Sequence, residues 1–364
     1  MNDYRKDLPE GTADGTVAKK KKSKVKKVLL IILLSVLGLI VALICAFFIL
    51  RAIGKSHFKP AIIGVDSIGA IDNALVYDDG KTISYNGKKY RYNEDVIFLG
   101  FMGVDKNSLD PVEGLDRSAG QSDTNMILAI DTDSGKASLI VIPRDSMVDI
   151  NILDPEGRVI ALSEMQLCLS YAYGDGRETS CENVLESMKR LLFGIEVNNY
   201  YSLDLDGIGA LNDAVGGVQV TCLETLTDLC TEGEVKTLWG KQAQKYVQVR
   251  DTSVFNSDAM RRKRQIQYVK AFVSKAFSAI KADFSTVTDL YNIAGNYSCT
   301  NFEISRVTYL ASVLVQKYDS FTINDEDIYI LPGEATMGKR FMEVRLDEKG
   351  VFETILKVFY KEID

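Results

Sequence analysis

An uncharged apolar segment of 23 residues, Val28 to Leu50, constrains this chain more than any other feature of its sequence. A helix rises about 1.5 Å per residue, so this segment reaches roughly 35 Å and can cross a ~30 Å hydrocarbon core with some tilt. A cleaved signal peptide is the alternative, but its apolar region would be shorter and a small-residue cleavage site would follow. Here the segment ends in Phe47 to Arg51. We therefore predict an uncleaved transmembrane anchor over residues 28–50.

A run of lysines precedes this anchor, whereas only Arg51 and Lys55 follow it closely. The lysines are Lys19, Lys20, Lys21, Lys22, Lys24, Lys26 and Lys27. The positive-inside rule then predicts a single-pass protein of the cell membrane, with a cytoplasmic tail of residues 1–27 and an extracytoplasmic body. The lysines either bind anionic membrane lipid, at about 1 kcal/mol each, or act only as a topology signal.

Charge is distributed unevenly along the chain. Residues 1–55 carry a net charge of +7 and the remainder carries −14. An acidic body argues against nucleic acid as a partner, because nucleic acid favours clustered positive charge. The tail is also too short to fold as a DNA-binding domain. About 300 residues remain outside, enough for one large domain or two small ones.

Cysteine and histidine usage limits the chemistry of the outer part. Cys45 lies in the anchor, and the later cysteines are Cys168, Cys181, Cys222, Cys230 and Cys299. Cys168–Cys181 and Cys222–Cys230 can pair in an oxidising compartment, although the sequence does not settle the connectivity. The sequence has no CxxC motif and no Cys/His cluster, so it does not predict a zinc site. The only histidine, His57, is next to the membrane, which excludes a Ser-His-Asp or Cys-His mechanism in the body.

The chain after the anchor begins with a short β segment. Thr82 to Tyr85 and Lys89 to Tyr92 flank Asn86-Gly87, a turn signal that predicts a hairpin. We assign residues 51–93 to an extracytoplasmic linker and hairpin adapter, and residues 94–364 to the main domain. From residue 94 the pattern is mixed α/β.

Apolar segments predict neighbouring strands at the start of the main domain. Val96 to Met102 leads into Gly103-Val104-Asp105, Thr124 to Ile130 follows Asp123, and Ala137 to Ile142 closes at Pro143-Arg144-Asp145. The short polar turn between the second and third segments predicts an antiparallel pair.

The ends of these strands bring charged residues to one edge of the sheet. In the antiparallel pair, Asp123 and Arg144 lie at the same end. Asp105 joins them if the first strand runs parallel to the third. Ligands commonly bind at strand ends in open α/β sheets, so this edge is a candidate site.

Later segments predict further helices and strands. The predicted elements are a helix over Cys181 to Phe193, a strand over Tyr200 to Leu205, a helix ending over Leu211 to Val215, a strand over Val218 to Cys222, a short helix over Trp239 to Lys245 and a strand-like segment over Tyr246 to Arg250. The clearest helix runs from Asp258 to Ala282, with Ser257 as its N-cap. Its predicted buried stripe consists of Ile266, Val269, Phe272, Val273, Ala276, Phe277 and Ile280.

Polar residues at the start of that helix share a direction with the stripe. Asp258, Arg261 and Gln265 are spaced i, i+3, i+7 and fall within about 60° of one another at 100° per residue. Arg262 also points that way, so the angle does not choose between the two arginines. Buried polar groups need partners. The cluster is therefore either part of a site or an N-terminal capping cluster that pairs with itself.

Two carboxylates and several arginines, in a body without a catalytic histidine, indicate one kind of chemistry. Carboxylates hold a hard divalent cation, and planar guanidiniums bind phosphate oxygens bidentately. Metal and arginine together can stabilise the charge that develops when phosphate is transferred.

The order of motifs resembles the LytR-CpsA-Psr domain family over roughly residues 94–364. The matching motifs are Gly103-Val104-Asp105, Ser122-Asp123-Thr124, Ile142-Pro143-Arg144-Asp145, Ser170-Tyr171-Ala172-Tyr173-Gly174, Ala214-Val215-Gly216-Gly217-Val218, Tyr246 to Arg250, Asp258-x-x-Arg261-x-x-Arg264-Gln265 and Leu331-Pro332-Gly333-Glu334. Each motif is loose alone, but their order behind a single anchor is specific.

The resemblance implies an α/β/α sandwich with a central mixed sheet and an apolar slot for a polyprenyl chain. It implies a phosphotransferase of the cell wall that joins a glycopolymer, such as a teichoic acid or capsule polymer, from a polyprenyl pyrophosphate carrier to peptidoglycan. Asp105 and Asp123 would ligate Mg²⁺ (or Mn²⁺). Arg144, Arg250, Arg261 and Gln265 would bind the pyrophosphate. Asp105, Arg144, Asp258 and Arg261 would form the catalytic set, with Asp258 orienting the others or acting as a base.

The sequence departs from the family pattern at positions near this site. Gln121 and Met147 stand where many members carry arginine, and Gln248 replaces the first arginine of the Arg-x-Arg segment. Arg117 or Lys106 would be substitutes by proximity. Two other functions therefore stay open: a slow or non-catalytic scaffold or sensor that binds lipid pyrophosphates, and a polyprenyl pyrophosphatase.

Overall fold

The structure is a computed structural model that describes residues 16–58, 62–64, 68–69, 71–112, 118–250 and 257–363. The chain divides into two compact units, residues 1–52 and residues 53–364.

Helix α1, Thr16–Ser56, accounts for nearly all of the first unit that the structure describes. Its segment Lys26–Ser56 is 31 residues long and apolar enough to cross a membrane. The leucine, isoleucine and valine side chains between Val28 and Leu50 are exposed, as expected for a helix that lipid would surround. The predicted anchor is therefore helical throughout and is a candidate membrane span.

The second unit is built on a mixed sheet. Among the described residues it has six strands in the order β12 (Ser298–Thr300), β9 (Tyr200–Leu203), β4 (Val96–Val104), β5 (Ser122–Asp131), β6 (Ala137–Ile142) and β13 (Ile328–Ile330). β5 is antiparallel to both β4 and β6, so β4 runs parallel to β6. The end of β4, the start of β5 and the end of β6 therefore meet at one edge, as predicted.

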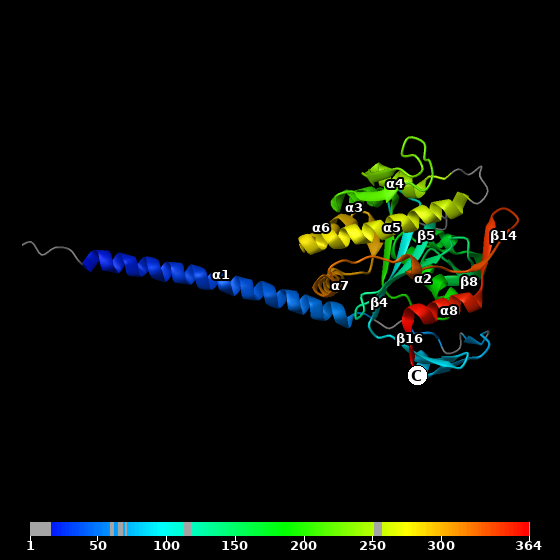
Figure 1. Cartoon of the computed structure of the whole chain (residues 1–364), viewed down its shortest axis with the longest axis horizontal. Helices are drawn as coiled ribbons and strands as arrows, with labels where there is room; N and C mark the ends of the chain where they lie inside the picture. Colours follow the sequence, from blue (N-terminus) through cyan, green and yellow to red (C-terminus); the bar gives the residue numbers. More distant parts are fainter. Residues whose placement is uncertain are drawn as a thin grey trace, which may run out of the picture. The chain divides into compact units, whose positions relative to one another are not determined.

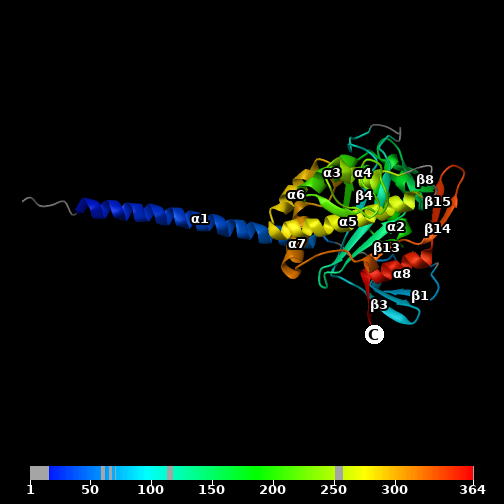
Figure 2. The same ribbon diagram turned by 45° about the horizontal axis from the view of Figure 1, so that its top comes forward.

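The strands of this sheet send alternate side chains into two cores. Ile127, Ala129 and Ile140 face one core, which contains helices α2 (Glu178–Leu191) and α8 (Glu348–Phe359). Met126 and Leu139 face the other, which contains α5 (Ser257–Ala282) and α7 (Ile304–Lys317). Side chains alternate with period two in a strand, so burial on both faces explains why these strands read as continuous apolar runs. The predicted α/β/α sandwich is confirmed, and Figures 1 and 2 show α5 crossing the strands.

Helix α5 differs from its prediction in how it is buried. Ile266, Val269, Val273 and Phe277 pack in the sheet core. Phe272 and Ala276 instead pack in a third core, beside Tyr268 and Ala271. The apolar residues of α5 therefore form two buried faces instead of the single predicted stripe, because the helix lies between two cores.

The third core lies under a small lobe that packs on a different face of α5 from the sheet core. It is formed by α3 (Leu205–Ala214), β10 (Val218–Thr221), β11 (Val235–Leu238) and α4 (Lys241–Gln248). The prediction of a strand-like segment from Tyr246 is wrong, because Tyr246 and Val247 continue α4. With Ala243 they form the buried side of this short helix. Cys222 and Cys230 form a disulfide in this lobe, whereas Cys168 and Cys181 are free thiols.

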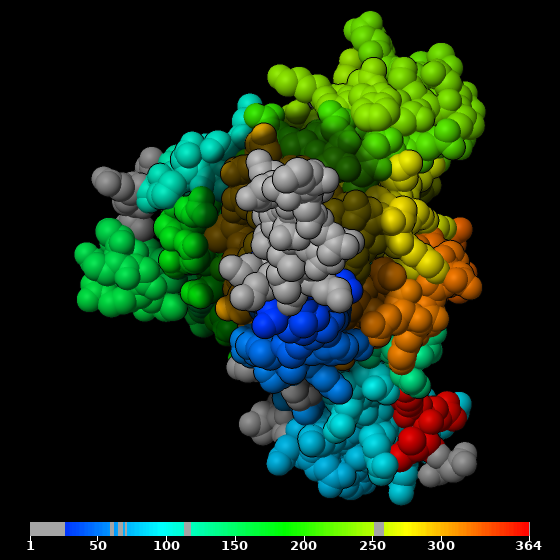
Figure 3. All heavy atoms as spheres, turned by 90° about the vertical axis from the view of Figure 1, so that its left-hand side faces the viewer, coloured from blue at the N-terminus to red at the C-terminus, as the bar shows by residue number. Residues whose placement is uncertain are grey.

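The hairpin predicted around Asn86-Gly87 belongs to a second sheet. β1 (Ala74–Tyr77), β2 (Thr82–Tyr85) and β3 (Lys88–Tyr92) are completed by the C-terminal strand β16 (Tyr360–Ile363). Asn86 and Gly87 both have positive φ, as the two-residue turn requires. Figure 3 shows the red C-terminal atoms against the cyan and blue atoms of the early strands. The segment assigned to the adapter thus shares a sheet with the chain's end.

The remaining elements flank these layers. They are the hairpin β7 (Met147–Leu153) with β8 (Val159–Gln166), the hairpin β14 (Gly333–Met337) with β15 (Met342–Leu346), helix α6 (Thr286–Gly295) and the 3₁₀ segments Asp78–Gly80, Leu167–Tyr173 and Asp325–Asp327.

The contact between α8 and the sheet gives a test of this architecture. Phe359 is fully buried, and its ring lies edge-on to Phe98, with centroids 5.4 Å apart. Phe359→Ala should lower the free energy of unfolding by about 3–5 kcal/mol, because it leaves a cavity between α8 and β4. Phe341→Ala is the matched control, since Phe341 is 69% exposed. Urea denaturation of the purified chain measures both, and a loss below about 1 kcal/mol in Phe359→Ala would contradict the packing.

Candidate active site

A small pocket lies at the sheet edge where β4 and β6 end and β5 begins. It is lined by Asp123, Thr124, Asn125, Met126, Val141, Ile142, Arg144, Asp258, Arg261, Arg262 and Gln265. The first turns of α5 form one wall and the strand ends form the other. Residues far apart in the sequence therefore share one cavity.

Asp123 joins the sheet to helix α5. One carboxylate oxygen accepts a hydrogen bond from Nη1 of Arg144, which follows β6. The other accepts from Nη1 of Arg261, at 3.2 Å. Asp123 is only 21% exposed and Arg261 7% exposed, so these charges are largely shielded from water. Shielded pairs are stronger and depend less on salt than surface pairs do.

Asp258 gathers the arginines of α5 and of the preceding segment. Oδ1 accepts from Arg261 at 2.6 Å and lies 3.4 Å from Nη1 of Arg250, and Oδ2 accepts from Arg262 at 2.9 Å. Burial raises the pKa of Asp258, but Arg261 and Arg262 outweigh it, so the pKa lies below its ordinary value of 3.8. Asp258 and Arg261 pair with each other, as a capping cluster would, and they also line the pocket. The two interpretations of the sequence therefore apply to the same residues.

Arg144 is held by partners that the site prediction did not include. Its Nη2 donates to Oε1 of Gln121 at 2.8 Å and to Sγ of Cys168 at 3.3 Å, and its Nε lies 3.4 Å from Asp145. Burial alone would lower the pKa of Arg144, but Cys168, Asp123 and Asp145 raise it above its ordinary value. Arg144 therefore stays charged, with its guanidinium plane fixed by several acceptors.

Gln121 gives a physical reason for one departure from the family pattern. Its amide oxygen accepts from Arg144, and its backbone N–H donates to Oδ1 of Asp105 at 2.6 Å. An arginine at this position would present a second positive charge to Arg144 instead of an acceptor. Gln121 therefore helps to orient Arg144, a contact that could not be predicted from the sequence.

Asp105 lies at the predicted edge but does not line the pocket. Burial around its carboxyl raises the pKa of Asp105, and Asp123 adds to this increase. Lys106, one of the suggested substitute cations, directs its amine to the carbonyl of Ser118 at 3.0 Å. Arg117, the other, lies outside the described residues.

Gln265 and Arg250 border the pocket from the α4 side. Gln265 lines the pocket, but its amide donates to the carbonyl of Val247 at 3.2 Å. Arg250 is 37% exposed and contacts only Asp258 among the described carboxylates. Gln248 lies on the exposed side of α4, where its amide oxygen accepts from Gln244 at 3.5 Å. Met147 is the first residue of β7 and pairs with Gln166.

Positive and negative charges nearly balance at this edge. In the described part of the chain, the guanidiniums of Arg144, Arg250, Arg261 and Arg262 are matched by the carboxylates of Asp123, Asp145 and Asp258. Arg262 and Asp145 were not among the predicted site residues. Arg262 could have been found from its helical angle, and Asp145 from its place in the Pro-Arg-Asp motif. An anion that enters must displace carboxylates from arginines.

The carboxylates offer a limited donor set for a metal ion. No group of three or more His, Cys, Asp or Glu side chains capable of holding an ion occurs among the described residues. Mg²⁺, however, commonly binds through one or two carboxylates, with water and substrate phosphate oxygens completing the octahedron. Asp123 is close enough to Asp105 to contribute to the raised pKa of that carboxyl. These residues fit a shared magnesium site that a phosphate would complete.

Comparison with known proteins matches this arrangement to a family. A model of the LytR_cpsA_psr family matches residues 68–350. The polyisoprenyl-teichoic acid–peptidoglycan teichoic acid transferase TagU of Oceanobacillus iheyensis is 26% identical over 226 residues, which is 60% of this chain and 62% of that protein. The matches to three such TagU proteins span 51–62% of the relatives' own lengths.

Solved structures agree with the fold. Protein gbs0355 from Streptococcus agalactiae has a TM-score of 0.58 at 22% identity, covering 72% of this chain and 86% of that one. TagV from Bacillus subtilis has a TM-score of 0.56 at 19% identity, covering 72% and 95%. At this identity the likeness establishes the shared fold alone.

Asp258 makes a testable contribution to stability that depends on pH. Because its pKa is lowered on folding, the ionised carboxylate stabilises the fold above the ordinary value of 3.8, and this is lost as the pH falls through the lower folded value. Asp258→Asn should lower the free energy of unfolding by about 2 kcal/mol at pH 7. The difference from wild type should shrink below pH 3.8.

Chemical denaturation between pH 7 and pH 3 measures this difference. Asp325→Asn is the control, because Asp325 is 86% exposed and, in the part of the chain that the structure describes, its side chain pairs with Lys270 alone. A difference for Asp258→Asn that stays constant over the whole pH range would show that its charge is not the source.

Proposed function

The chain belongs to the LytR-CpsA-Psr family, and we propose that it is a membrane-anchored phosphotransferase of the cell wall. In this proposal it takes a glycopolymer from a polyprenyl pyrophosphate carrier and joins it to peptidoglycan through a phosphodiester bond. The names of the TagU relatives support this activity, and the family match supports the domain that would carry it. The glycopolymer is of the teichoic acid or capsule kind.

The observation that carries the proposal is the meeting of Asp123, Arg144, Arg261 and Asp258 around one small pocket. The charged residues that line the pocket, Asp123, Arg144, Asp258, Arg261 and Arg262, suit a phosphate group rather than an apolar prenyl chain. Guanidiniums that converge from a strand end and from a helix can bind oxygens of both phosphates of a pyrophosphate. In this proposal the reaction takes place at the phosphates, and the polymer and the lipid lie outside the pocket.

The reaction needs positioning more than covalent chemistry from the protein. The oxygen of a peptidoglycan sugar hydroxyl attacks the phosphorus that carries the glycopolymer, and the bridging P–O bond breaks. Polyprenyl phosphate leaves with the bridging oxygen, and the hydroxyl proton passes to a carboxylate or to water. Arg144 and Arg261 stabilise the charge that develops on the phosphate oxygens.

The contacts of Asp258 favour one of its two predicted roles. Its oxygens accept from Arg261 and Arg262, and its pKa is lowered, so it is a weak proton acceptor. Asp258 therefore serves to orient these arginines rather than to act as a base.

Magnesium, or manganese, belongs to the proposal as the cofactor that Asp105 and Asp123 would hold. When bound, the ion would act as a Lewis acid toward the phosphate oxygens. Binding to Asp123 would also free Arg144 and Arg261 from their carboxylate partner. The guanidiniums would then be available to phosphate.

The topology of the proposal follows from the lysine-rich tail. With the amino terminus in the cytoplasm, the domain after α1 works outside the membrane, where peptidoglycan and the lipid carrier are found. Anionic lipid at the inner leaflet would hold the lysines.

A binding protein for lipid pyrophosphates is the second candidate function. The observation in its favour is that the arginines of the pocket already have carboxylate partners, which lowers the gain from binding a phosphate. Purified full-length chain with a lipid-linked glycopolymer, magnesium and peptidoglycan separates the candidates. Transfer to peptidoglycan supports the transferase, retention without turnover the binder, and phosphate release without acceptor a pyrophosphatase.

Substitutions at the strand edge test the catalytic assignment. Arg144→Ala and Asp123→Ala should each lower turnover at least about tenfold, because each removes a partner of the transferred phosphate. Arg158→Ala is the control, since Arg158 is 72% exposed and pairs within its own hairpin. Initial rates of glycopolymer transfer give the comparison, and wild-type rates in both pocket variants would remove the site assignment.

Metal dependence is tested by binding as well as by turnover. Inorganic pyrophosphate should bind at least about tenfold more tightly with Mg²⁺ than with EDTA, because an ion held by Asp105 and Asp123 would supply positive charge to the anion and compete with Arg144 and Arg261 for Asp123. Isothermal titration calorimetry of wild type and Asp123→Asn measures this. An equal benefit from Mg²⁺ in both proteins would place the ion elsewhere.

A further inference from the structure

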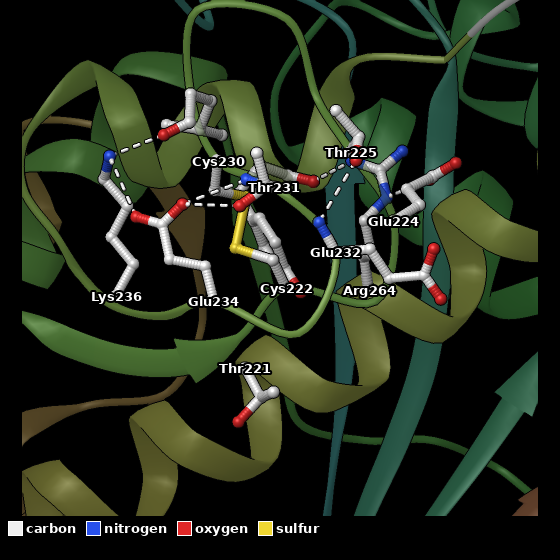
Figure 4. The surroundings of a disulfide bond; sticks show 12 residues. Thr221, Cys222, Glu224, Thr225, Cys230, Thr231, Glu232, Glu234, Lys236 and Arg264 are labelled. Carbon is white, nitrogen blue, oxygen red and sulfur yellow. Dashed lines mark hydrogen bonds and ion pairs between the residues drawn. A yellow bond between two sulfur atoms is a disulfide. The ribbon is translucent and has the colours of Figure 1, made fainter.

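A disulfide-closed loop lies behind the pocket, on the far side of α5's first turns. Cys222 ends the β10 segment, and Cys230 closes the loop eight residues later. Leu226 and Leu229 bury the loop's inner side in the third core, and the backbone N–H of Leu226 donates to the carbonyl of Cys230 at 2.8 Å. The loop is thus fixed at both ends and along its base (Figure 4).

This loop presents Glu224 to a buried arginine. Glu224 lies 2.9 Å from the guanidinium of Arg264, which belongs to α5 and is fully buried. Figure 4 shows the two side chains together, on the opposite side of the loop from Lys236. A buried guanidinium needs a carboxylate and further acceptors to offset its lost hydration.

Arg264 finds those acceptors at the end of helix α4. Its two terminal nitrogens donate to the carbonyls of Tyr246 and Val249, and its guanidinium lies 5.7 Å from the ring centroid of Tyr246. The neighbouring Gln265 donates to the carbonyl of Val247. The last carbonyls of a helix have no partners within it, so Arg264 and Gln265 fix the point where α4 ends.

The residue that follows Val249 is Arg250, which reaches Asp258 in the pocket wall. We infer that the Cys222–Cys230 loop, through Glu224 and Arg264, positions Arg250 for binding of the pyrophosphate. Glu224 and Arg264 are positioning residues in this account, since neither lines the pocket. The inference rests on the proposed function for its pyrophosphate ligand. The mechanical link, which runs from Glu224 through Arg264 to Arg250, does not depend on that function.

A purely structural role is the competing account. An ion pair under a small lobe could stabilise the fold without any effect on Arg250 beyond general loosening. The two accounts differ in whether the effect of Glu224 on anion binding passes through Arg250.

The test uses full-length chain and matched substitutions in the loop and in the turn that follows it. Glu224→Gln removes the charge that faces Arg264. Glu234→Gln makes the same chemical change in a carboxylate that bonds Thr231 and lies 3.9 Å from Lys236, away from Arg264. Cys222→Ser with Cys230→Ser opens the loop without altering Glu224.

Hydrogen–deuterium exchange over residues 241–250 reads the mechanical link without reference to function. Glu224→Gln and the double cysteine variant should speed exchange of these amides at least about threefold, whereas Glu234→Gln should not. Unchanged exchange in Glu224→Gln, or an equal change in Glu234→Gln, would overturn the inference.

Binding of inorganic pyrophosphate with Mg²⁺ then tests the consequence in a double-mutant cycle. Glu224→Gln should weaken binding at least about threefold in wild type, and should have little further effect once Arg250→Ala is present. An equal loss in both backgrounds means that Glu224 does not act through Arg250 and overturns the inference. If wild type itself binds no pyrophosphate, the proposed function fails at that step, and the exchange result alone decides on the link.

Discussion

The carboxylate of Asp123 is the interaction on which the rest of the site depends. Asp123 is the second residue of β5 and contacts both Arg144, which follows β6, and Arg261 of α5, so it joins the helix to this edge of the sheet. Because the Asp123 carboxylate pairs with both guanidiniums, it also offsets part of the positive charge that a ligand of the pocket would meet. Any group that takes Asp123 away from these arginines, whether a cation or an anion that competes with it, changes what the pocket can bind.

Much of the fold follows from local patterns that the sequence displays. Continuous apolar runs ending in charged residues located β4, β5 and β6, and the short polar turn set β5 and β6 antiparallel. Asn86-Gly87 predicted the β2–β3 hairpin. The sequence does not predict in which core each apolar residue of a helix is buried. Helix α5 lies between two cores, and its apolar residues pack in both. The end of α4 also escaped prediction, because a helix of eight residues gives too little periodicity to outweigh a β-like composition.

The main charged residues of the site could be predicted from the sequence, but the residues that orient them could not. The predicted hairpin places Asp123 and Arg144 at one end of the sheet, and a first strand parallel to the third adds Asp105. The partners that orient these charges come from elsewhere: Cys168 and Gln121 for Arg144, and Glu224 for Arg264. Such contacts join residues with no fixed spacing, so only the folded chain reveals them.

The most direct test of this account is a crystal structure of the chain with a prenyl pyrophosphate analogue and Mg²⁺. The account predicts that the two phosphates contact Arg144 and Arg261, with the ion on Asp105 and Asp123 and the former carboxylate–guanidinium contacts of Asp123 released. An analogue bound elsewhere, with Asp123 still paired to both arginines, would contradict it.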